Sequence, residues 1–171
     1  MWQPHGSLLT TGAKPFETRG WATAFRGPIL IHAARRFVRK EWLHYLGYGK
    51  FRAGLAPLAG LPMNFDSPPN WVGLTVRRTD LWAEVIPFES DDWVCQIPLG
   101  AFIGVGELVN CIPIEQMTDE QWKRSRGFGD FSSGRFAWEI KDVRRFKTPI
   151  PAKGRQGFFF GHVEPDRMVF A

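Results

Sequence analysis

Cysteine is scarce in this chain, and its pattern excludes a common class of metal site. The 171 residues include two cysteines, Cys95 and Cys111, with no CxxC motif and no Cys/His spacing of the kind that binds zinc. The four histidines are scattered along the sequence. We therefore expect neither a metal nor a cofactor, and we expect the two thiols to be reduced, as in a cytoplasmic protein.

Long apolar runs are also missing. No stretch approaches the roughly 20 apolar residues that a membrane-spanning helix needs. The first residues, MWQPHGSLLTTG, have neither the basic region nor the cleavage site of a signal peptide. These absences predict a cytoplasmic protein without a membrane partner.

Aromatic residues, glycine and proline are plentiful. The chain has 15 Phe and 8 Trp, and its 18 Gly and 13 Pro imply many turns and short elements. This composition favours a β-rich α+β fold. The net charge of +5 is compatible with a nucleic-acid partner, although a basic balance is equally compatible with a protein that binds no polyanion.

Hydrophobic periodicity and turn signals give an order of elements that predicts a small, partly closed β-barrel with flanking helices. Residues 50–92 are rich in Pro and Gly at their start and are predicted to form one insertion or lid in a single domain over residues 1–171. The expected elements are helices over 5–12, 34–49 and from Thr118 onwards, and strands over 15–21, 29–32, 93–114, 134–146 and after a basic turn at 153–157.

The segment TTGAKPFETRGW concentrates charge beside a glycine and an aromatic residue. Glu17 and Arg19 share one face of the predicted strand, because side chains alternate along a strand. Together with Lys14 they could line a polar cleft, in which the cations hold a phosphate or a carbonyl oxygen and the carboxylate accepts from an amino group. The alternative is an exposed edge strand with a Glu–Arg pair.

Gly12, Lys14 and Arg19 form the motif G-x-K-x-x-x-x-R. Around it stand Trp2-Gln3-Pro4, Glu17 to Trp21 and RGPILIHA at 26–33, and the segment 134–159 follows near the other end. With these features, both ends of the sequence resemble the ASCH domain, the activating-signal-cointegrator homology branch of the PUA-like superfamily, and 134–159 resembles the last strands of such proteins.

The resemblance implies a PUA-like barrel that binds RNA or a nucleotide in a cleft lined by the motif residues. Some small relatives are amidohydrolases acting on acylated cytidine, and a ribonuclease activity is proposed within the family. If this chain is an enzyme, Lys14 and Glu17 are the catalytic candidates. However, Glu17 stands where the hydrolases carry a nucleophilic Thr, Thr18 is expected on the other face of the strand, and Glu107 and Glu120 are only candidates for their catalytic Glu.

A base held in the cleft would need a planar stacking partner and polar groups for its edge. The predicted ligand-binding residues are Gln3, Lys14, Glu17, Arg19, Trp21 and Trp138, with the tryptophans alternatively part of the core. Basic residues elsewhere could follow a nucleic-acid backbone or simply be solvated. These backbone candidates are Arg35, Arg36, Arg39, Lys153, Arg155 and Gln156. The sequence thus favours an RNA- or nucleotide-binding module, with an amidohydrolase or ribonuclease, or a protein-interaction domain, as alternatives.

Overall fold

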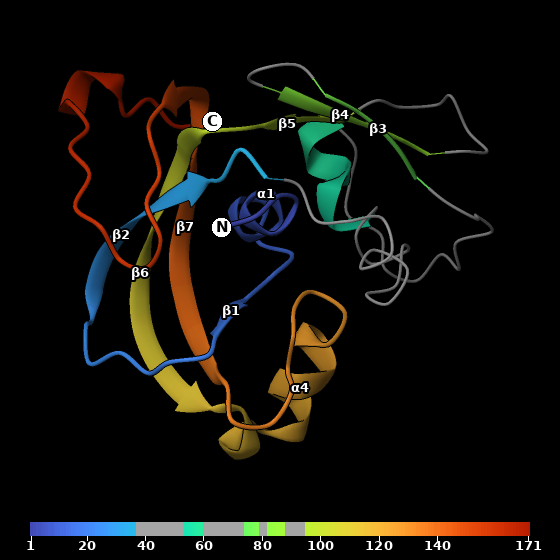
Figure 1. Cartoon of the computed structure of the whole chain (residues 1–171), viewed down its shortest axis with the longest axis vertical. Helices are drawn as coiled ribbons and strands as arrows, with labels where there is room; N and C mark the ends of the chain where they lie inside the picture. Colours follow the sequence, from blue (N-terminus) through green and yellow to red (C-terminus); the bar gives the residue numbers. More distant parts are fainter. Residues whose placement is uncertain (37–52, 60–73, 79–81, 88–94) are drawn as a thin grey trace.

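The computed structural model describes residues 1–36, 53–59, 74–78, 82–87 and 95–171, and its main feature is a four-stranded antiparallel sheet (Figure 1). The strand order is β1-β7-β6-β2. The central strands β6 and β7 are the longest, at 13 and 16 residues. The bounds are Phe16–Arg19 for β1, Gly27–Ala33 for β2, Ala101–Pro113 for β6 and Phe136–Pro151 for β7.

One face of this curved sheet holds the short helix α1, His5–Thr10, as predicted (Figure 1). Leu9 of α1 is fully buried in a cluster with Ile31, Ile103 and Trp138, so the helix is anchored to β2, β6 and β7. Gly12 then reverses the chain with a φ of 81°, a conformation that favours glycine. Because of this turn, the chain passes directly from the helix into β1.

The opposite face of the sheet is covered by the C-terminal segment. Phe102 and Ile150 form a cross-strand pair, and with Phe146 they pack against Phe159 and Phe170. The segment is tied to β7 by an isolated bridge between Phe146 and Phe170. The closing strand predicted after residue 157 is wrong, because this segment crosses the face of the sheet and is held there mainly by aromatic side chains.

A second antiparallel sheet has the order β3-β4-β5, with β3 at Leu74–Arg78, β4 at Trp82–Pro87 and β5 at Cys95–Pro98. The first two strands form a hairpin inside the predicted insertion 50–92. Single helical turns occur at η1 Ala56–Ala59, η2 Ile114–Gln116 and η3 Pro165–Arg167.

The helix predicted from Thr118 onwards is confirmed as α4, Asp119–Ser125. Its first turn has a capping box: the Thr118 hydroxyl accepts from the Gln121 backbone N–H, and the Gln121 side chain accepts from the Thr118 backbone N–H. The helix predicted over 34–49 lies almost entirely outside the described residues. In the described part of the chain, no helix has the length and apolar character needed to cross a membrane.

The sheet is not closed into the predicted barrel. Among the described strands, β1 and β2 stand at opposite edges of the main sheet, β1 paired to β7 and β2 to β6. Strand β1 has only four residues, and the segment that follows it, residues 20–26, runs to β2 without forming a strand. The β-rich class with a few short helices is confirmed.

Gly104 is required where β6 and β7 shift register. A Cβ atom at this position would lie 2.5 Å from the carbonyl oxygen of Arg144, which is backbone and cannot move aside easily. We expect Gly104→Ala to lower the free energy of unfolding by about 2 kcal/mol, measured by urea denaturation. Gly20→Ala is the matched control, because the nearest atom to its added Cβ is 4.0 Å away. Equal stabilities of the two variants would contradict this account.

Candidate functional site

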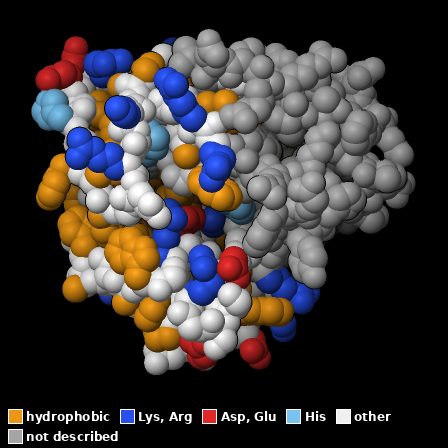
Figure 2. Space-filling model, in the orientation of Figure 1, with side chains coloured by type: hydrophobic (Ala, Val, Ile, Leu, Met, Phe, Trp, Pro, Cys, Tyr) orange, Lys and Arg blue, Asp and Glu red, His pale blue; other side chains and the backbone are white. Residues whose placement is uncertain are grey.

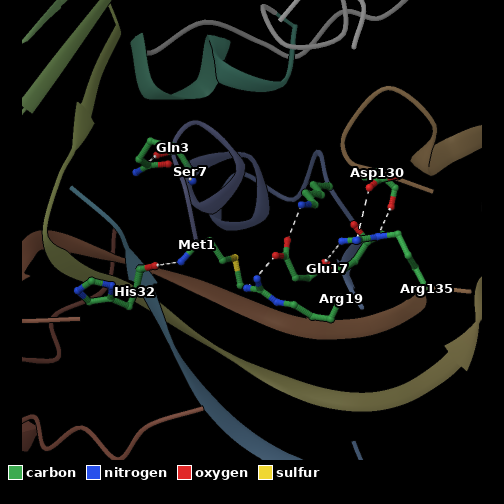
Figure 3. A network of polar contacts seen from close by, with 10 residues as sticks. Met1, Gln3, Ser7, Glu17, Arg19, His32, Asp130 and Arg135 are labelled. Atoms are coloured by element: carbon green, nitrogen blue, oxygen red, sulfur yellow. Dashed lines mark hydrogen bonds and ion pairs between the residues drawn. The ribbon is translucent and has the colours of Figure 1, made fainter. Parts of the chain in front are cut away.

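A buried ion network lies where the chain enters β1. Lys14 and Glu17 are only 3% and 6% exposed. The Lys14 Nζ donates to Glu17 Oε2 at 2.5 Å, and Arg19 Nη2 lies 2.9 Å from Glu17 Oε1 (Figure 3). Because the carboxylate contacts a different cation on each oxygen, the three side chains hold one another in a fixed arrangement.

The register of the sheet explains this placement. Glu17 is paired with Trp138 of β7, and side chains of directly opposed residues lie on the same face. Phe16 and Thr18 point to the other face, where Phe16 packs in a separate apolar cluster. Strand β1 is thus an edge strand with a Glu17–Arg19 pair, as in the alternative interpretation, but Phe16, Glu17 and Thr18 are buried rather than exposed.

The electrostatics of the pair keep the carboxylate ionised. Burial alone would raise the pKa of Glu17, but the positive charges of Lys14 and Arg19 and the bond from Lys14 lower it to about 2. Burial lowers the pKa of the Lys14 ammonium, against the opposing effect of the Glu17 carboxylate. Glu17 is thus a permanent acceptor, whereas Lys14 gives up its proton more readily than a solvated lysine.

The network opens into a large cleft of about 1720 Å³. Figure 2 shows a hollow in this face where acidic, basic and apolar side chains meet. The structure brings nearly all of the predicted site residues to its lining. These are Lys14, Glu17, Arg19, Trp21, Trp138, Arg35, Arg36, Lys153, Arg155 and Gln156.

Gln3 does not line this cleft. It is fully buried, and its side-chain amide donates to Ser7 Oγ and to the Pro98 carbonyl while its oxygen accepts from the Ser7 N–H. Its contacts tie α1 to the end of β5. Arg39 lies outside the described residues.

Trp138 is a buried part of the cleft wall and presents little surface to the solvent. Its ring is only 4% exposed and belongs to the apolar core, and its Nε1 donates to the Trp21 carbonyl. Trp21, in contrast, is 41% exposed. Of the two predicted stacking partners, only Trp21 presents a substantial surface to a ligand.

Sequence reasoning missed several polar residues of the cleft, among them His5 and Arg135. Burial lowers the pKa of His5 to about 3, so the imidazole is neutral at pH 7. Arg135 bonds to the backbone oxygens of Thr18 and Asp130 and lies 3.4 Å from the Asp130 carboxylate (Figure 3). Their spacing from Lys14, Glu17 and Arg19 in the sequence does not identify either residue. His5 is brought to the site by the chain reversal at Gly12, and Arg135 by the pairing of β7 with β1.

The candidates for a catalytic Glu are not brought to the site. Neither Glu107, in the middle of β6, nor Glu120, on the exposed side of α4, lines the cleft. Within the described ranges, no group of His, Cys, Asp and Glu side chains could hold a metal ion. Cys111 is a free thiol whose sulfur accepts from the Thr23 N–H.

The buried pair has a predictable effect on stability. We expect Glu17→Gln to lower the free energy of unfolding at pH 7 by about 3 kcal/mol, because Lys14 would lose its buried counter-charge. The folded pKa of Glu17, about 2, lies below its ordinary value of 4.5, so the unfolded chain takes up the proton first. The contribution of Glu17 is therefore complete above pH 4.5 and is lost as the pH falls towards 2.

Urea denaturation between pH 7 and pH 2.5 measures both effects, with Glu139→Gln as the control. Glu139 pairs with Lys141 at the surface, where an ion pair contributes about 0–1 kcal/mol. The account is contradicted if Glu17→Gln has the same free energy of unfolding as the wild type at pH 7. It is also contradicted if the difference in free energy of unfolding between the two proteins is as large at pH 2.5 as at pH 7.

Comparison with known proteins places the chain in a family. No curated protein matches the chain. The family model described as the ASCH domain matches residues 1–150, which include α1, β1, the buried ion network and nearly all of β7. The segment that carries Lys153, Arg155 and the C-terminal aromatic residues lies outside the match. Since the match covers most of the 171 residues, the chain belongs to the ASCH domain family.

Proposed function

We propose that this protein is an RNA- or nucleotide-binding module, and that its cleft holds a base over the Lys14–Glu17–Arg19 network. The observation that carries the proposal is the burial of Lys14 and Glu17, with the partly exposed Arg19 beside them, at the floor of an open cleft. Desolvating charges costs free energy, and such groups are often retained for function rather than for stability. The family membership and the PUA-like relationship that its motif implies support the same conclusion.

The chemistry of the floor suits a base edge. Ionised Glu17 retains lone pairs beyond those used by Lys14 and Arg19, and can accept from an exocyclic amino or ring imino group. Arg19 is 36% exposed at its side chain, so its guanidinium can reach a carbonyl or phosphate oxygen. Neutral His5, whose ring is hydrogen-bonded to the Phe128 backbone, adds a polar side chain to the lining of the same cleft.

The rim suits a polyanion. Arg36 lies with its guanidinium 5.0 Å from the ring centre of Trp2, and Lys153 and Arg155 are exposed on the C-terminal loop. These cations are part of the lining of the cleft and do not lie on a distant face of the molecule. They would contact phosphates and fix the position of a strand, without selecting its sequence.

An amidohydrolase or ribonuclease is the second candidate, favoured by one observation, the lowered pKa of Lys14. A lysine of lowered pKa can act as a general base. Against this, Lys14 donates directly to Glu17, and a carboxylate with a pKa of about 2 is a poor base. The arrangement is better suited to holding a ligand than to hydrolysing an amide.

A binding panel tests the proposal. The probes are fluorescein-labelled RNA hexamers of each base, the four nucleoside monophosphates and N4-acetylcytidine. We expect at least one RNA to bind, with an affinity that falls as salt rises. Arg19→Ala should weaken this binding about ten-fold or more, because it removes a hydrogen-bond donor of fixed charge.

Arg167→Ala is the matched control, since this arginine is exposed in η3 and does not line the cleft. Release of acetate from N4-acetylcytidine by water, lost in Lys14→Ala, would establish the hydrolase instead. If no RNA or nucleoside binds, the proposal is wrong and a protein-interaction domain remains.

A further inference from the structure

Three exposed aromatic side chains form one cluster beside the ion network. Phe158 stacks on Trp138, with ring centroids 4.9 Å apart and an interplanar angle of 26°. Trp21 and Phe25 contact Phe158 edge-on, at 5.6 and 5.7 Å between centroids. Phe158 therefore lies at the centre of the cluster, with the buried Trp138 ring beneath it.

The upper side of the cluster is open to solvent. Trp21, Phe25 and Phe158 are 41%, 45% and 47% exposed, although each already contacts another ring. Such clustered exposure of large apolar rings is costly in water and marks a binding surface. A planar ligand placed on Phe158 would extend the existing Trp138–Phe158 stack by one layer, between the edges of Trp21 and Phe25.

The loops that carry these rings are held in place. Arg26 donates to the carbonyl oxygens of Thr23 and Phe25, which fixes the turn before β2. Phe158 is followed by Phe159, which is anchored in the apolar cluster on the outer face of the sheet. The rings are thus positioned before any ligand arrives, which lowers the entropic cost of binding.

Cations line the same cleft as the cluster. Arg19 is two residues before Trp21, and Lys153 and Arg155 precede Phe158 on the same loop. Among the described residues, neither Lys153 nor Arg155 takes part in an ion pair. An apolar platform in one cleft with cations that form no ion pair in the described part of the chain matches a ligand that is planar and polyanionic, which describes a nucleic-acid strand better than a protein surface.

The platform adjoins the floor of the cleft. Trp138, which supports Phe158, is the cross-strand partner of Glu17, and all of these side chains line the same cleft. A base over Glu17 and a base on Phe158 would therefore be neighbours.

We propose that Trp21, Phe25 and Phe158 form a stacking platform for a second base of single-stranded RNA, next to the base held over Glu17. This inference rests on the proposed function and makes it narrower: the ligand is a strand of at least two unpaired nucleotides, rather than a free nucleoside. Phe158 lies beyond residues 1–150, so the family match does not include the centre of the platform.

The test compares the RNA hexamer that binds best with its nucleoside monophosphate. Phe158→Leu keeps an apolar side chain of similar bulk but removes the ring. It should weaken hexamer binding about ten-fold, while monophosphate binding changes by less than about two-fold. Phe158→Trp should retain hexamer binding, because it restores a stacking face.

A matched pair of tryptophans provides the second measurement. Trp21 and Trp122 are each 41% exposed, but only Trp21 lines the cleft. We expect Trp21→Ala to weaken hexamer binding and Trp122→Ala to leave it unchanged. Circular dichroism and thermal unfolding of each variant show that the loss is not caused by unfolding.

The outcomes separate this inference from the function on which it rests. If the hexamer binds and Arg19→Ala weakens it, but Phe158→Leu and Trp21→Ala do not, the second-base platform is wrong and the proposed function stands. An equal loss of hexamer and monophosphate binding also overturns it, because both probes would then use one base site. A lower molecular mass of Phe158→Leu in solution, with unchanged RNA binding, assigns the cluster to a contact between two copies. Failure of the wild type to bind any RNA rejects both proposals.

Discussion

The contact between Lys14 and Glu17 is the constraint around which the rest of the site is arranged. Two opposite charges can be buried together only if the backbone holds them within hydrogen-bond distance and the surroundings exclude water. The Gly12 reversal supplies the first condition by turning the chain from α1 into β1. The sheet and α1 supply the second, since the core cluster that contains Leu9 and Trp138 closes the space beside the pair. The floor of the cleft is therefore rigid because it belongs to the same packed unit as the core.

The local elements of the fold could be predicted where the sequence carries a local signal. The capping residues of the helix after Thr118 are recognisable in the sequence. The alternation of side chains along β1 likewise places Glu17 and Arg19 on one face. Burial could not be predicted in this way. A four-residue strand with a Glu and an Arg has the pattern of an exposed edge, and only its pairing with β7 and the covering helix make it interior.

The same limit applies to the site residues. Lys14 and Arg19 could be identified because a family motif links them in sequence, and Glu17 because it shares a strand face with Arg19. Gln3 stands in the same resemblance, yet it is fully buried and ties α1 to β5, because motif residues can be retained for packing as well as for binding. His5 lies in the cleft because the chain reverses at Gly12, and Phe158 because the segment after β7 folds back onto Trp138. Neither arrangement can be predicted from residue spacing in the sequence. The partly closed barrel was over-predicted for a related reason: counting strands does not show whether the first is long enough to meet the other edge.

Strand β7 has a consequence for how binding properties can diverge among related chains. Near its start it provides Trp138, and near its end it provides Phe146, which holds the chain terminus through Phe170. The loop between Pro151 and Phe158 leads from the end of β7 to the ring that stacks on Trp138, and its residues are largely exposed. A residue gained or lost in this loop would leave both anchors in place and would shift only the ring above Trp138. Loop length is thus a parameter through which evolution can alter ligand preference without altering the fold.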